Sequence, residues 1–148
     1  MEYNLKCNEE QLKIINKSLD LFSRVLMGQL DEVALVFRNE NINNDKFDFT
    51  KINNLSNEFR NLKRNIGLSP NSNYGIHNDE FVSDSSRKSY DILQVIRHKL
   101  AWDRVNKDPK KDDRDFKSMF GVCFDEPYKS SNDDKFKLPI LENNKNAN

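Results

Sequence analysis

One helical segment carries most of the residues in this chain that could do chemistry. It reads SSRKSYDILQVIRHKLAWDR and covers residues 85–104. At about 100° per residue, its polar side chains form one narrow helical stripe, made of Arg87, Asp91, Gln94 and His98. The edges of the stripe carry Tyr90, Arg97 and Trp102. Guanidinium groups hold phosphate and aromatic rings stack on bases, so the pattern predicts a site for a planar, charged, nucleotide-type ligand.

A second interpretation of this stripe stays open. Arg87 and Asp91 can form an i,i+4 ion pair that contributes only a few tenths of a kcal/mol, with the other polar residues simply exposed. Tyr90 and Trp102 argue against a purely solvated face, because large aromatic side chains usually bury most of their area.

Catalysis and metal binding are less favoured by the spacing. His98 and Asp91 are seven residues apart, two helical turns, which is too far for a direct pair of base and orienting carboxylate. A zinc site would need Cys7, His77, His98 and Cys123, which lack the paired spacing of zinc ligands. We therefore expect no catalytic residue, no metal and no cofactor.

The charge balance limits the classes of partner. Lys and Arg number 24 and so do Asp and Glu, which gives a formal net charge of zero. This balance disfavours an electrostatic grip on duplex nucleic acid and equally a DNA mimic built from massed acidic side chains. The densest basic cluster, RNLKR at residues 60–64, is typical of a solvated helix face. We expect no nucleic-acid partner.

The cysteines and the hydropathy indicate the compartment. The two cysteines lie far apart, and no apolar run follows the initiating methionine. No uninterrupted apolar segment has the length that crosses a bilayer. We expect a protein of a reducing cytoplasm without membrane association.

Amphipathic helices are predicted to position the stripe. Asn8 and Gln11 have the spacing of a capping box for a helix that begins near Glu9, and its apolar period continues to Gly28. There the helix bends or a second one begins. A further helix is predicted over residues 49–66, with Gly67 as its C-terminal cap. Before the first helix, alternation at Tyr3, Leu5 and Cys7 indicates a short strand.

The second half of the chain contains a long loop and an irregular tail. Residues 67–84 are rich in Gly, Pro, Ser and Asn, and the apolar surface of Tyr74, Ile76 and Phe81 favours an ordered loop, with a turn or strand near residues 74–77. Ser83 or Asp84 caps the helix that carries the stripe. Apolar islands at residues 116–128 and 136–141 predict short strands or segments draped over the helices, and residues 143–148 are predicted to be disordered.

These elements predict a mainly α fold. We expect a compact bundle of three to four helices with minor β content and an irregular C-terminal tail, forming a single domain over residues 1–142. Amphipathic helices of this kind often complete a site across a symmetric interface, so we expect a homo-oligomer.

Several motifs resemble a family of small proteins encoded by tailed phages and prophages. They are NYGIHND at residues 73–79, RKSYDILQVIRHKLAWDR at 87–104, VCFDEPYKSS at 122–131 and KLPIL at 137–141. The opening LDLFSRVLMGQLDEV at residues 19–33 also fits, and the stretch KDPKKDDRDFKSMF at 107–120 departs from it as a longer link. The resemblance brings no established mechanism, but it implies a counter-defence protein that acts in the cytoplasm of a host cell.

Two functional hypotheses follow. In the first, the protein sequesters a nucleotide-type immune signalling molecule between the helix and the preceding loop, with ligand-binding residues Tyr74, Arg87, Tyr90, Asp91, Gln94, Arg97, His98 and Trp102. In the alternative, it inhibits a host defence protein directly through aromatic and arginine side chains on its surface. A phosphodiester-cleaving enzyme that uses His98 is a third and weaker hypothesis.

Overall fold

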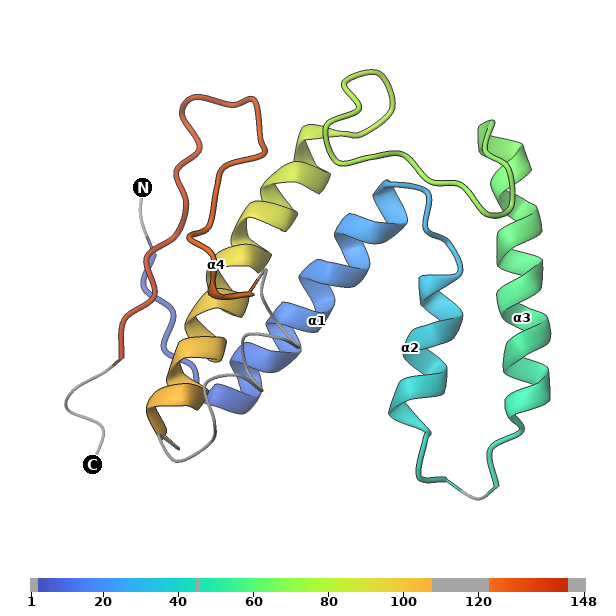
Figure 1. Ribbon diagram of the computed structural model, residues 1–148, viewed down its shortest axis with the longest axis horizontal. Helices are drawn as coiled ribbons and strands as arrows, with labels where there is room; N and C mark the ends of the chain where they lie inside the picture. The colour runs from blue at the N-terminus through green and yellow to red at the C-terminus, as the bar shows by residue number, and fades with distance from the viewer. Residues whose placement is uncertain (1–2, 45, 108–122, 144–148) are drawn as a thin grey trace. The chain divides into compact units, whose positions relative to one another are not determined.

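Four α-helices and one short 3₁₀ helix carry most of the residues that the computed structural model describes, which are residues 3–44, 46–107 and 123–143 (Figure 1). The elements are α1 (Glu9–Leu26), α2 (Glu32–Glu40), α3 (Phe49–Leu62), η1 (Lys63–Ile66) and α4 (Asp84–Lys107). None of the described residues belongs to a β-strand. The protein is therefore mainly helical, as the sequence predicts.

The ends of the helices follow the capping signals in the sequence. α1 begins at Glu9 behind the predicted capping box, in which the N–H of Asn8 donates to Gln11 Oε1 at 2.9 Å and the N–H of Gln11 donates to Asn8 Oδ1 at 2.8 Å. η1 continues α3 and ends at Ile66, and the left-handed φ of 77° at the following Gly67 confirms the predicted glycine cap.

The predicted short strands are not formed by the described residues. Residues 3–8 are irregular, and Tyr3 and Leu5 are exposed there rather than half-buried. Near residues 74–77 the predicted turn is found, at residues 76–77, and the alternative strand is not; residues 136–141 form no strand either. A two-residue alternation over so short a stretch needs a neighbouring strand to pair its backbone groups, and the described chain offers none.

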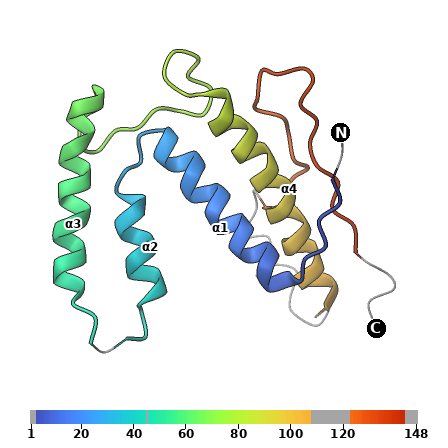
Figure 2. The same cartoon turned by 180° about the vertical axis from the view of Figure 1, so that it is seen from behind.

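The contacts of the chain define two units, and each is described by itself. The first unit comprises the described parts of residues 1–19 and 88–148. In both views, α4 lies beside the first part of α1, and residues 123–143 run along α4 (Figures 1 and 2). The core lies on one face of α4, where Leu93, Ile96 and Ala101 are buried, and Ser89 Oγ of α4 donates to the carbonyl of Leu19 at 3.0 Å.

The second unit comprises residues 20–87. In it α2 packs against α3, and Ala34 of α2 is fully buried. Asp31, just before α2, ties the start of this helix to the end of α3. Its carboxylate accepts from Arg60 Nε at 3.1 Å and pairs with Lys63 Nζ at 2.7 Å.

A glycine makes the turn between α1 and α2 possible. Gly28 has a φ of 80°, a left-handed value that side chains with a Cβ rarely adopt. A Cβ at this position would lie 2.4 Å from Leu68 Cδ1. Of the two outcomes that the sequence allows at Gly28, a new helix is therefore the one found.

The loop between η1 and α4 is held by specific contacts of Tyr74. Its backbone N–H donates to the carbonyl of Met27 at 2.9 Å, and its hydroxyl donates to the carbonyl of Ile66 at 2.7 Å. Its ring stacks on Phe81 with the centroids 4.8 Å apart. The apolar surface that the sequence places in this loop is thus used to order it.

Some expectations lie beyond these observations. The single domain over residues 1–142 and the closed bundle stay predictions. The link within residues 107–120 lies outside the described residues except for Lys107, and so does the predicted disordered tail except for Asn143. The apolar island at residues 116–128 is described only from Cys123 onward, and in that part it forms no strand.

The Gly28→Ala substitution tests the turn. We expect it to lower the free energy of unfolding by about 1–2 kcal/mol or more, because the left-handed backbone disfavours a side chain and the new Cβ meets Leu68. Gly75→Ala is the matched control, since a Cβ there meets nothing within 4 Å. Denaturant midpoints measure both variants, and equal midpoints would contradict this role of Gly28.

Candidate functional site

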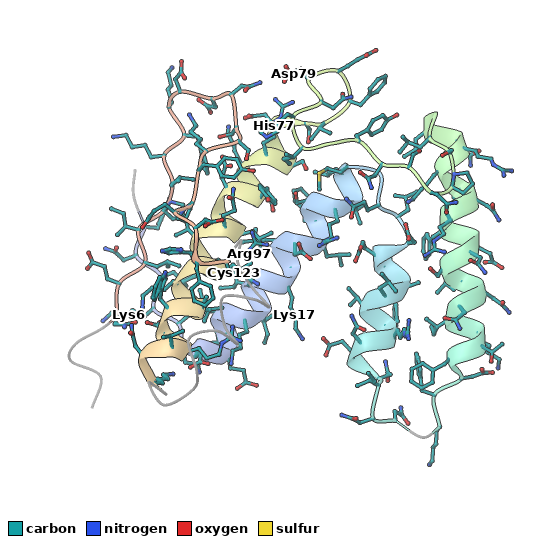
Figure 3. The ribbon with its side chains drawn as sticks, viewed as in Figure 1. Lys6, Lys17, His77, Asp79, Arg97 and Cys123 are labelled. Atoms are coloured by element: carbon teal, nitrogen blue, oxygen red, sulfur yellow. The ribbon has the colours of Figure 1, made fainter. Side chains whose placement is uncertain are left out.

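Arg87, at the beginning of the polar stripe, is buried and holds the preceding loop. Its Nε donates to the carbonyl of Ile76 and its Nη2 to the carbonyl of Asn78, both at 3.0 Å. Nη2 also pairs with Asp79 at 2.7 Å, in the loop that leads into α4 (Figure 3). The guanidinium therefore takes its partners from its own chain.

Asp91 and Gln94 hold the C-terminal segment against α4. Asp91 is fully buried, and its two carboxylate oxygens accept from the backbone N–H groups of Ser130 at 2.6 Å and Ser131 at 3.1 Å. One turn later, Gln94 Nε2 donates to the carbonyl of Tyr128 at 3.1 Å. A solvated face would leave these side chains in water, so that interpretation of the stripe is wrong.

The aromatic edge of the stripe also contacts the C-terminal segment. Trp102 packs edge-on against Phe124 with the centroids 5.2 Å apart and against His98 at 6.3 Å. Burial first, and then the neighbouring Tyr90, raises the pKa of the Tyr128 hydroxyl. His98 Nδ1 is buried and has no hydrogen-bond partner among the described residues. Tyr90 and Trp102 thus contact Tyr128 and Phe124 of the C-terminal segment, and His98 contacts Trp102.

The eight predicted ligand-binding residues therefore do not share one environment. Tyr74 and Arg87 lie in the second unit, whereas the other six lie in the first. Within the first unit, Asp91 and Gln94 use their polar groups on the C-terminal segment. Arg97 differs from them, because its Nε is buried without a hydrogen-bond partner among the described residues.

Arg97 lines a cavity of about 740 Å³ within the first unit. Cys123, a second lining residue, is labelled near Arg97 in Figure 3. The cavity, called the cationic cavity below, is lined by Glu9, Lys13, Asn16, Arg97, Leu100, Arg104, Lys107 and Cys123. Four of these side chains are cationic, and Glu9 is the one carboxylate among the described lining residues. Such an excess of positive charge attracts an anion.

The polar atoms of the cationic cavity are unequally satisfied. Glu9 pairs with Lys13 at 2.7 Å and with Lys107, and these two partners, Lys107 foremost, lower its pKa to about 2. Arg97 Nε and Asn16 Oδ1 are buried and have no partner among the described residues. A buried donor and a buried acceptor without partners cost free energy that a polar ligand can recover.

Sequence reasoning found Arg97 but missed the rest of this lining. The signal was present as spacing: Arg97, Leu100, Arg104 and Lys107 follow one another at three and four residues, and so share a helix face. Lys13 and Asn16 repeat that spacing on α1. Which of the two faces of α4 meets α1 is decided by packing, which the sequence alone does not give.

No family model, curated protein or solved structure matches the chain. Among the described residues, no group of three or more His, Cys, Asp or Glu side chains is placed to hold a metal ion. In the same part of the chain, no helix combines the length and the apolar character needed to span a bilayer.

An Asp91→Asn variant tests the buried carboxylate. Asparagine keeps the shape but turns an N–H₂ group toward a backbone N–H, so one buried donor loses its acceptor. We expect the free energy of unfolding to fall by about 1–3 kcal/mol. Asp134→Asn, exposed on the same C-terminal segment, should change it by less than about 0.5 kcal/mol. Denaturant unfolding of both variants measures the difference, and equal losses would contradict the tether.

The ion pairs of Glu9 predict a pH dependence. The folded-state pKa of about 2 lies below the ordinary value of 4.5, so the pairs favour the folded state above pH 4.5. This contribution is lost as the pH falls through about 2. In an NMR titration we expect Lys107→Gln and Lys13→Gln to raise the pKa of Glu9, whereas Lys17→Gln, outside the cavity, leaves it unchanged. A Glu9 pKa near 4.5 in the unaltered protein would contradict the ion pairs of Glu9 with Lys13 and Lys107.

Proposed function

We propose that the protein is a non-catalytic binding protein that holds a nucleotide-type molecule by its phosphates in the cationic cavity. The observation that carries this proposal is the buried Nε of Arg97, which has no hydrogen-bond partner among the described residues and lies among three further cationic side chains. A guanidinium offers parallel N–H donors that match two phosphate oxygens, and burial strengthens such bonds. The volume of about 740 Å³ is within the usual range for small-molecule sites.

The residues that line the cationic cavity are better suited to binding a ligand than to catalysing its hydrolysis. A general base for hydrolysis needs a pKa near the working pH. Glu9, the carboxylate of the cavity, has a pKa of about 2 because Lys107 and Lys13 hold it ionised. Its lone pairs are already engaged, so it is a poor proton acceptor. The four cationic side chains can hold phosphate without moving protons.

The resemblance to phage and prophage proteins gives this binding a biological purpose within the proposal. The protein would sequester a nucleotide-type immune signalling molecule in the cytoplasm of the host cell and release it intact. We also propose a homo-oligomer, because several apolar side chains of α2 and its neighbours are exposed, among them Val36, Phe37, Ile42 and Phe49.

The same exposed side chains favour the alternative function. Phe37 and Ile42 are 55% and 65% exposed, and aromatic and aliphatic anchors of this kind often dominate protein–protein interfaces. A direct inhibitor of a host defence protein would use this surface and would leave the cationic cavity without a role. The two functions therefore depend on different residues.

The test compares Arg97→Gln with the unaltered protein, using ADP-ribose and a cyclic dinucleotide as probes in isothermal titration calorimetry. We expect Arg97→Gln to weaken binding by about tenfold or more, because it removes the guanidinium whose Nε is buried. Arg38→Gln removes an exposed arginine of α2 and is the matched control, with unchanged affinity expected. Circular dichroism checks that both variants fold.

Three outcomes would contradict the proposal. If Arg97→Gln and the unaltered protein bind the probes with equal affinity, the ligand does not bind at Arg97. Appearance of a cleaved nucleotide, instead of recovery of the intact probe after heating, indicates an enzyme. Co-purification of a host polypeptide without binding of either probe favours the direct inhibitor.

A further inference from the structure

A second cavity lies directly beside the cationic cavity. It has a volume of about 770 Å³ and lies among residues 5–12, the last turns of α4 and residues 141–143. Glu9, Leu100 and Lys107 line both cavities. The two cavities therefore share part of their wall, which includes Leu100 and the ion pair of Glu9 with Lys107.

The second cavity offers a different chemistry from the first. Its apolar lining, which gives it the name leucine cavity here, consists of Leu5, Leu12, Leu100 and Leu141. Beside these leucines, the charged side chains of Lys99 and Asp103 have partners within the chain. Lys99 Nζ pairs with Asp103 and donates to Asn143 Oδ1 at 2.8 Å, and Asn143 Nδ2 donates to Asp103 Oδ1 at 3.2 Å. Lys6 and Glu142 also line this cavity, so its charged side chains are of both signs and lie beside four leucines, whereas positive charge prevails among the described residues of the cationic cavity.

One further side chain gives the leucine cavity a polar contact suited to a base. Asn106 lines this cavity on the exposed side of α4, and its carboxamide carries both donors and an acceptor. A nucleobase has an apolar face and an edge of alternating donors and acceptors, so leucines and a carboxamide together match it. Phosphate, in contrast, has no favourable partner among four leucines.

We propose that the two cavities bind the two ends of one nucleoside diphosphate unit. The phosphates occupy the cationic cavity and the nucleoside occupies the leucine cavity. Lys107, shared by both, stands where the two parts of the ligand join. This inference rests on the proposed function and adds to it how the site tells a nucleotide from any other polyphosphate.

The test measures the affinities of ADP, inorganic pyrophosphate and hexyl phosphate by isothermal titration calorimetry. We expect the double variant Leu5→Ser, Leu141→Ser to weaken ADP binding by about fivefold or more and to leave pyrophosphate binding unchanged. Leu5 is 76% exposed, so the fold does not depend on its burial. Ile140→Ser is the matched control, because Ile140 is 84% exposed beside Leu141 and outside the cavity.

The outcomes separate this inference from the proposed function. Unchanged ADP affinity in the double variant overturns the two-cavity assignment, while a loss in Arg97→Gln still supports phosphate binding. Hexyl phosphate bound as tightly as ADP also overturns it, since the leucine cavity would then accept any apolar group. Failure of the unaltered protein to bind either ADP or pyrophosphate overturns both.

Discussion

The buried carboxylate of Asp91 is the interaction on which the first unit depends. A fully buried carboxylate is costly unless its oxygens accept hydrogen bonds, and here each oxygen accepts from one of two consecutive backbone N–H groups. Those two groups belong to Ser130 and Ser131, so the same bonds hold the C-terminal segment on α4. Phe124 packs on Trp102, and Cys123 lines the cationic cavity on the same segment.

α4 has two polar faces with opposite uses. Asp91 and Gln94 point their polar groups into the chain, where backbone groups of residues 128–131 satisfy them. Arg97, Arg104 and Lys107 lie at helical spacing on another face and line a cavity. Polar groups with internal partners stabilise the fold, whereas a buried polar group without a partner keeps its capacity to bind. We therefore regard the cavity beside α1, and not the stripe, as the candidate site, because Asp91 and Gln94 of the stripe already have partners in the chain.

Within the proposed function, the positively charged side chains of the cationic cavity select an anionic ligand. Lys13 and Lys107 both pair with Glu9, the one carboxylate among the described lining residues, so their attraction for a further anion is reduced but not removed. In the described part of the chain, Arg97 has no such partner at Nε. An arriving phosphate would therefore interact most strongly with the guanidinium, while the lysines supply attraction at longer range. Within the proposal, the leucines of the adjoining cavity add apolar surface, which suits a ligand with one anionic and one apolar end.

The sequence by itself determined the helices, their caps and the polar stripe, because these depend on residues close together along the chain. The capping box of Asn8 and Gln11 and the glycine cap at Gly67 are local in this sense, whereas the sequence left a bend or a new helix open at Gly28. Only the tertiary structure decided what the stripe contacts. The partners of Asp91 are 39 and 40 residues away, and no local pattern encodes so distant a pairing. The cationic cavity was hidden for the same reason, since its lining combines α1, α4 and Cys123.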